Sequence, residues 1–207
     1  MSEARARTGR RHPAAAGGRA ALRRLVEAAM DLERLAMLLY CKFESRFAAV
    51  EELRAFWFDM AQHESRHFGA LALVAGLLDR SPNPSFQSVA LLTPARVQHL
   101  RRLLTRFHAE ADEALPIERA FAMAVQVEGS EIEDVVLDLV QALRGDREHE
   151  RATKALMHDL GDLSFMIEKH TADRDLLARA DRLLERQVSR LRSRPLKARR
   201  AGRHPLR

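Results

Sequence analysis

Residues 60–68 read Met-Ala-Gln-His-Glu-Ser-Arg-His-Phe, and they place Glu64 and His67 in the middle of an apolar helical stripe. That stripe recurs at three- and four-residue steps through Leu53, Phe56, Trp57, Met60, Phe68, Leu71, Val74 and Leu78. The spacing predicts one amphipathic helix over roughly residues 50–78. A carboxylate on the buried stripe of a helix is costly unless it protonates or finds a cation. Glu64 is therefore the first candidate ligand.

Three further predicted helices carry an acid on their apolar face. Glu33 interrupts the stripe of a helix over about residues 21–48, and Glu128 interrupts that of a helix beginning at Pro116. In a helix over about residues 147–170, the apolar stripe is interrupted by Asp159 and Asp162. A helix in a bundle keeps its charges on the solvent side. Four inward acids at comparable depth therefore indicate a shared cation.

The spacing of these acids supports the same conclusion. Glu33 precedes Glu64 by 31 residues, and Glu128 precedes Asp159 by 31 residues. A shift of 95 residues lays residues 63–67 on residues 158–162. The sequence therefore predicts two helical hairpins of one design that face each other across a pseudo-twofold axis.

The rest of the chain is also predicted to be helical. Ser81-Pro82-Asn83-Pro84 ends the second helix, Thr93-Pro94 opens a connecting helix that runs to about Ala114, and Gly145-Asp146 ends the helix that begins at Pro116. A last amphipathic helix covers about residues 172–192. No segment alternates with period two for long enough to predict a strand. The fold class is all-α, a four-helix bundle with a connecting helix and a C-terminal helix.

This arrangement resembles the ferritin-like superfamily and, within it, the rubrerythrin-like branch, over about residues 22–170. The resemblance is carried by Glu33 with Tyr40 seven positions later, by Glu64-x-x-His67, and by Glu128-Gly129-Ser130-Glu131. It implies two iron atoms per chain between four helices, with Glu64 and its counterpart Asp159 bridging the metals. It also implies that Glu33, Glu128 and His67 are terminal ligands, and Glu131 is similar to the additional third-helix Glu of rubrerythrins.

The chain departs from the family in its fourth helix, where Asp159-x-x-Asp162 stands in place of Glu-x-x-His. An all-oxygen half-site favours harder ions such as Mn²⁺ or Mg²⁺. Three outcomes stay open: a full dimetal site, a single-metal site, and a metal-free relic. The expected activity is a peroxide- or oxygen-dependent oxidoreductase or iron oxidation. The resemblance also implies a homodimer.

The composition of the chain limits which classes of protein it can belong to. The chain has 207 residues, of which 46% are hydrophobic and 31% charged, enough for one domain with a sizeable core. With Cys41 alone, an internal disulfide, a Cys-rich zinc module and a rubredoxin-like domain are excluded, so electrons would come from a separate donor protein. The absence of a long apolar run argues against a transmembrane segment and a secretory signal, and predicts a cytoplasmic protein.

The net charge of +6 is concentrated at the two ends of the chain. Residues 1–20 hold five Arg against one Glu, and residues 190–207 hold seven Arg and one Lys without an acid, so residues 21–189 are net acidic. We expect a bundle over residues 21–192 between disordered basic tails at residues 1–20 and 193–207. The tails are expected to be solvated, or to contact nucleic acid or an anionic surface.

Two alternatives use the same residues. His63-Glu64-x-x-His67 matches the zincin motif, in which two His and a catalytic Glu lie on one helix. The ferritin-like interpretation leaves His63 as a flanking residue. The other alternative is a metal-free helical scaffold or interaction protein with basic tails.

Overall fold

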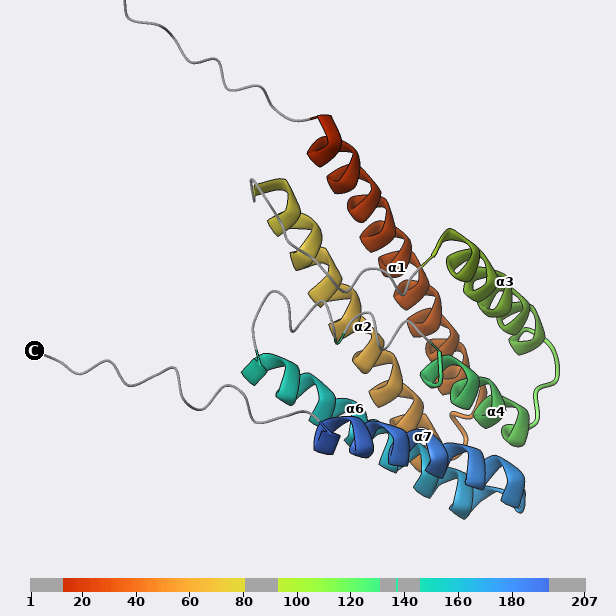
Figure 1. Cartoon of the computed structure of the whole chain (residues 1–207). Coiled ribbons are helices and arrows are strands. Elements are labelled where there is room, and N and C mark those ends of the chain that lie inside the picture. Colours follow the sequence, from red (N-terminus) through yellow and green to blue (C-terminus); the bar gives the residue numbers. More distant parts are fainter. Residues whose placement is uncertain (1–12, 81–92, 131–136, 138–145, 194–207) are drawn as a thin grey trace, which may run out of the picture.

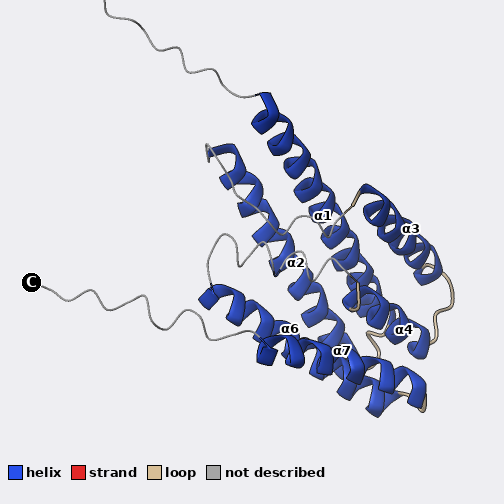
Figure 2. Ribbon diagram, in the orientation of Figure 1, coloured by secondary structure: helices blue, strands red, loops and turns tan. Residues whose placement is uncertain are grey.

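The computed structural model describes residues 13–80, 93–130, 137 and 146–193. These ranges contain six helices and no strand, which confirms the all-α prediction (Figure 2). The helices are α1 (Pro13–Arg46), α2 (Glu51–Arg80), α3 (Pro94–Ala111), α4 (Ile117–Glu128), α6 (Asp146–His170) and α7 (Arg174–Ser193).

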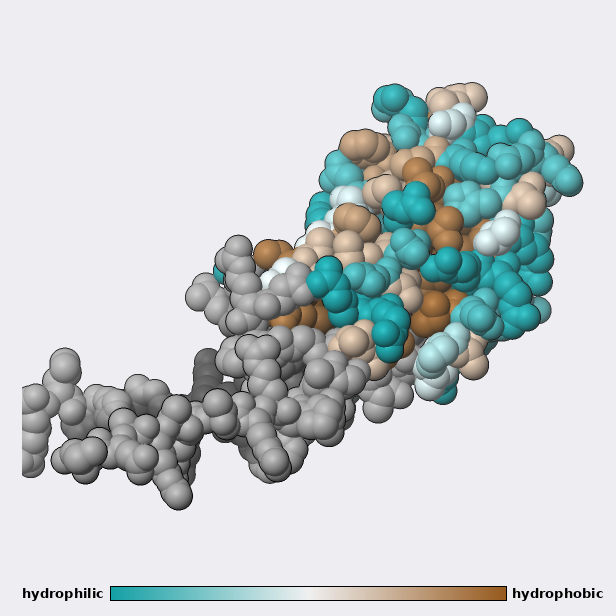
Figure 3. All heavy atoms as spheres, turned by 90° about the horizontal axis from the view of Figure 1, so that it is seen from above, coloured by the Kyte–Doolittle hydropathy of each residue, from teal (hydrophilic) through white to brown (hydrophobic). Residues whose placement is uncertain are grey.

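The two longest helices, α1 and α2, form an antiparallel hairpin that is the frame of the structure (Figure 1). A tight turn joins them, in which the N–H of Val50 donates to the carbonyl of Phe47 over 3.0 Å. Helix α3 packs along α1, while α6 and α7 pair with each other and run obliquely to the hairpin. Helix α4 contacts both α6 and α7. Figure 3 shows a face on which hydrophilic residues predominate and apolar side chains show between them.

An aromatic cluster fills the core near the hairpin turn. The fully buried ring of Trp57 lies 4.7 Å from Phe56, 4.9 Å from Phe43 and 5.2 Å from Phe121, measured between ring centroids. Tyr40 stacks on Trp57 at 5.9 Å. Offset and edge-to-face contacts of this kind add to the free energy that apolar burial supplies. The cluster ties α1, α2 and α4 together at one end of the hairpin.

The helix boundaries follow the sequence signals in most places. Thr93 caps α3 as expected, because its side chain accepts a hydrogen bond from the N–H of Arg96, and Pro94 occupies the first turn. Pro116 stands directly before α4. The first helix begins at Pro13, within the tail that we expected to be disordered, since alanine at positions 14–16 and 20 favours the helix strongly.

Helix α4, predicted to begin at Pro116, ends earlier than expected, and Gly129 is its C-cap residue. We expected it to continue to Gly145, but α4 ends at Glu128. A Cβ atom at Gly129 would lie 2.9 Å from the Val125 carbonyl and 3.1 Å from a methyl group of Leu183 on α7. Glycine allows α7 to approach the end of α4. Residues 131–136 and 138–145 lie outside the described residues.

Helix ends of opposite polarity hold α2 and α6 together. Glu52, in the first turn of α2, pairs with Lys169 at 2.5 Å and with His170 at 3.3 Å, both in the last turn of α6. The hydrogen bond from Lys169 is the main reason that the pKa of the exposed Glu52 carboxyl is lowered. Each charge also complements the dipole of its own helix. This contact fixes how α6 meets the hairpin.

No described helix has the length and apolar character needed to cross a bilayer.

Two phenylalanines on the hairpin provide a test of the core. Phe43 is fully buried and Phe58 is 48% exposed. We expect Phe43→Ala to lower the free energy of unfolding by about 3–5 kcal/mol, because it leaves a cavity in the aromatic cluster. Phe58→Ala should change it by about 0.5 kcal/mol or less. Urea unfolding followed by circular dichroism measures both, and equal losses would contradict this description of the core.

Candidate metal centre

The hairpin brings Glu33 of α1 together with Glu64 and His67 of α2. All three side chains are buried, with exposed fractions of 1%, 1% and 7%. One ligand atom of each lies within 4.8 Å of the others. The Nδ1 atom of His67 is 3.4 Å from Oε2 of Glu64 and 3.9 Å from Oε2 of Glu33. Within the described residues, this is the group of acid and imidazole side chains that could hold a metal ion.

Helical periodicity explains this convergence. Glu64 and His67 are three residues apart on α2 and therefore share one face. Glu33 reaches them from the antiparallel α1, whose neighbouring stripe positions carry the small buried residues Ala29 and Ala36. These small side chains let the two helices approach closely at the depth of the acids. The prediction that Glu33, Glu64 and His67 face one another from two helices is confirmed.

The charge state of Glu64 suits a ligand. Burial raises the pKa of its carboxyl and is the largest single effect, but the hydrogen bonds with His67 and Glu33 and the charges of His67 and His63 together lower it more. The net pKa lies below the ordinary value for glutamate. The ionised form of Glu64 is therefore stabilised inside an apolar helix pair by His67, Glu33 and His63.

The separations fit a small cation. A metal 2.1 Å from two ligand atoms at a tetrahedral angle holds them about 3.4 Å apart. The distance between Nδ1 of His67 and Oε2 of Glu64 is 3.4 Å, and that between Nδ1 of His67 and Oε2 of Glu33 is 3.9 Å. One imidazole nitrogen with two carboxylate oxygens is a donor set that iron, manganese and zinc accept.

His63 is a buried member of the centre that the sequence interpretation left as a flanking residue. Its Nε2 atom lies 2.7 Å from Nε2 of His67. Its Nδ1 atom contacts a carboxylate oxygen of Asp159, which comes from α6. The one-turn spacing of the two histidines on α2 was a sequence signal for this contact.

Asp159 therefore reaches the centre through His63. The sequence interpretation made Asp159 a bridging ligand, equivalent to Glu64. In the structure its carboxylate lies against the imidazole of His63, and it is not among the converging ligand atoms. The shorter side chain of aspartate leaves room for an imidazole between it and the rest of the centre.

Glu128 lies buried at the end of α4, where its Oε1 atom accepts a hydrogen bond of 2.7 Å from the hydroxyl of Tyr40. Glu128 is not one of the three residues whose ligand atoms converge.

One further proposed ligand, Asp162, lies away from the centre. The side chain of Asp162 is 56% exposed and pairs at 3.0 Å with His158, one turn earlier on α6. Asp159 takes the inward position of α6, so Asp162 faces solvent and needs no buried cation. Glu131 lies outside the described residues. Of the two acids that the 95-residue shift aligns with Glu64 and His67, Asp159 lies beside the centre and Asp162 does not.

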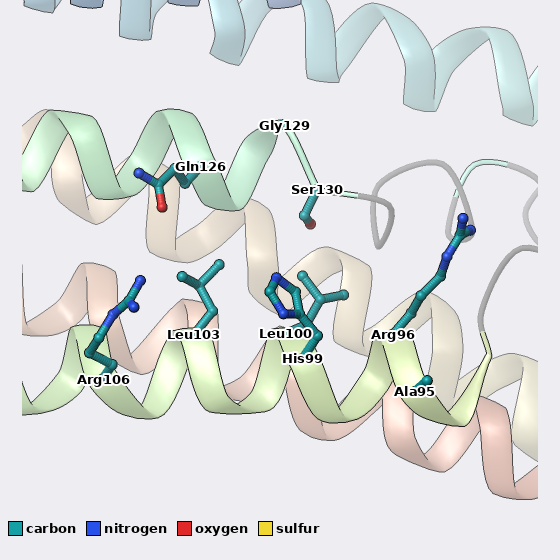
Figure 4. Close-up of a pocket in the computed structure, with 9 residues that line it drawn as sticks. All are labelled: Ala95, Arg96, His99, Leu100, Leu103, Arg106, Gln126, Gly129 and Ser130. Carbon is teal, nitrogen blue, oxygen red and sulfur yellow. The ribbon is translucent and has the colours of Figure 1, made fainter.

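Two surface grooves flank the end of α4, away from the buried acids. One lies between α3 and α4 and has a volume of about 680 Å³, with Arg96, His99 and Arg106 extending from α3 towards α4 (Figure 4). The other lies against α7 and has a volume of about 730 Å³. Neither groove is lined by a residue of the Glu33, Glu64 and His67 group.

Comparisons of the chain with protein-family models, with curated proteins and with solved structures found no match.

The bond between Tyr40 and Glu128 gives a prediction independent of metal. We expect Tyr40→Phe to lower the free energy of unfolding by about 1–3 kcal/mol, because a buried carboxylate loses a strong donor. A double-mutant cycle with Glu128→Gln, read by urea unfolding, should give a coupling energy of at least about 0.5 kcal/mol. Additive losses would contradict a direct interaction between these side chains.

Proposed function

We propose that this chain is a ferritin-like metal-binding protein that holds iron between α1 and α2 through Glu33, Glu64 and His67. The observation that carries the proposal is the convergence of two carboxylates and one imidazole nitrogen in a buried site. Two carboxylates brought together away from water repel each other, and a divalent cation removes that repulsion. The residue types and their helical positions are also those on which the resemblance to the ferritin-like superfamily rests.

The ligands favour one tightly bound ion per chain. Asp159 is engaged with His63 and Asp162 is exposed, so a second ion would have Glu128 as its buried carboxylate. The resemblance implies two irons per chain, and metal counting separates these stoichiometries. The mixed nitrogen and oxygen donors suit Fe²⁺ first and Mn²⁺ second.

The proposed activity is an oxygen- or peroxide-dependent oxidation, or the oxidation of iron itself. Bound iron would supply the one-electron chemistry. The anionic Glu33 and Glu64 would stabilise its more highly charged state, and the surrounding apolar side chains would limit the access of water. Tyr40 would hold the carboxylate of Glu128 in place by donating a hydrogen bond from its hydroxyl group. Reducing electrons would come from a separate donor protein.

The zincin alternative fits the geometry less well. Two imidazole nitrogens that share a metal at 2.0–2.1 Å lie roughly 3.3 Å apart. The Nε2 atoms of His63 and His67 are 2.7 Å apart, a hydrogen-bonding distance, and the other nitrogen of His63 faces Asp159. The two rings therefore interact with each other rather than with one ion.

Metal counting tests the proposal. We expect the protein, reconstituted anaerobically with Fe²⁺ and desalted, to retain about one iron per chain by elemental analysis. Glu64→Gln should weaken binding by at least about 100-fold, since changes beyond the ligands alone typically cost 10–100-fold. Asp162→Asn, the matched change of an exposed acid on α6, should bind as the unaltered chain does. A well-folded protein that binds no divalent ion would overturn the proposal.

Metal should also stabilise the fold. With free Fe²⁺ or Mn²⁺ at about 100 times its dissociation constant, the free energy of unfolding should rise by about 2.7 kcal/mol. A chelator should reverse the gain, and Glu64→Gln should abolish it. Thermal unfolding at several metal concentrations measures this. A transition temperature independent of metal in the unaltered protein would contradict binding to the folded state.

A further inference from the structure

Three side chains form a line from α6 into the metal centre. The carboxylate of Asp159 contacts Nδ1 of His63, and Nε2 of His63 lies 2.7 Å from Nε2 of His67. The far nitrogen of His67, Nδ1, is the atom that faces Glu64 and Glu33. Both rings are buried, and the side chain of Asp159 is largely so.

Hydrogen-bond chemistry fixes where the protons in this line lie when His67 is a ligand. A carboxylate only accepts, so a hydrogen bond at the contact between Asp159 and His63 requires the proton on Nδ1 of His63. A neutral imidazole with its proton on Nδ1 has a lone pair on Nε2. The proton between the two rings is then donated by Nε2 of His67. That donation leaves a lone pair on Nδ1 of His67, the form in which an imidazole binds a metal.

We propose that His63 and Asp159 are positioning residues for His67, which hold its Nε2 proton and its ring plane so that Nδ1 is directed at the metal. The inference rests on the proposed metal site and extends it with two residues that do not touch the ion. Groups that bind the free nitrogen of a ligand histidine typically fix its tautomer and orientation. Here the imidazole of His63, on α2, lies between the carboxylate of Asp159, on α6, and the ligand His67.

This role differs in a measurable way from that of a direct ligand. If Asp159 bound the metal itself, its loss would weaken binding whether or not His63 was present. As a positioning residue it acts only through His63. Once His63 is replaced by a side chain without a nitrogen, the further substitution of Asp159 should have no additional effect on affinity.

The test uses Zn²⁺ as the probe, because it is diamagnetic and has no redox chemistry. We expect His63→Phe to weaken Zn²⁺ binding about 10–100-fold, measured by competition with a chromophoric chelator. His63→Gln should retain most of the affinity, since its amide oxygen can accept the Nε2 proton of His67. Asp159→Asn should weaken binding, because an amide also donates and so permits the opposite tautomer. The double variant should bind like His63→Phe alone.

Nitrogen-15 NMR of the Zn²⁺-loaded protein gives the structural readout. We expect His67 bound through Nδ1 with its proton on Nε2, and that proton in exchange-protected contact with His63. His158→Phe, which removes an exposed histidine of α6, is the matched control and should leave spectrum and affinity unchanged. Circular dichroism checks that each variant folds.

The outcomes separate this inference from the proposed function. If the unaltered protein binds no Zn²⁺, Fe²⁺ or Mn²⁺, the metal site itself fails. If metal binds and Glu64→Gln abolishes it, but His63→Phe binds as the unaltered chain does, the metal site stands and the positioning role is overturned. Additive losses in the double variant would likewise overturn it and make Asp159 a ligand in its own right.

Discussion

The structure depends on two carboxylates that are kept away from water. Glu33 and Glu64 lie in the seam between α1 and α2, where apolar packing would otherwise be continuous. Removing an ionised carboxylate from water costs several kcal/mol, and only a balancing charge offsets this cost. His67 supplies part of that balance, and it is held in turn by His63 and Asp159. The inward polar residues of α2 and α6 thus all help to offset the cost of burying the two carboxylates.

Much of this could be predicted from the sequence, because helical periodicity places side chains reliably on faces. The stripe through Met60 and Leu71 located α2, and Thr93-Pro94 located the start of α3. The juxtaposition of Glu33 with Glu64 and His67 followed from their inward positions on an antiparallel pair. The position of His63 at one turn before His67 contained the signal for their contact, but we assigned the inward face to Glu64 and His67 and left His63 as a flanking residue.

The remaining differences arise where tertiary packing decides between equivalent helical positions. Asp159 and Asp162 are three residues apart, and either could have faced inward by periodicity alone. The contact with His63 selects Asp159, while Asp162 pairs with His158 outside. Likewise α4 ends at Glu128, where Gly129 leaves room for Leu183 of α7, a residue more than fifty positions away in the chain.

The pairing of Glu52 with Lys169 and His170 joins the first turn of α2 to the last turn of α6 and favours one rotational setting of α6. A helix turns by about 100° per residue, so a slip of α6 by a single residue would present His158 or Leu160 to His63 in place of Asp159. His63 would then face the imidazole of His158 or the methyl groups of Leu160, and no carboxylate would lie behind it. These surface contacts of Glu52, some three turns of helix away, therefore favour the setting of α6 in which a carboxylate lies behind His63. Substitutions at Glu52, Lys169 or His170 could therefore alter the chemistry of the centre without replacing any residue of the centre itself.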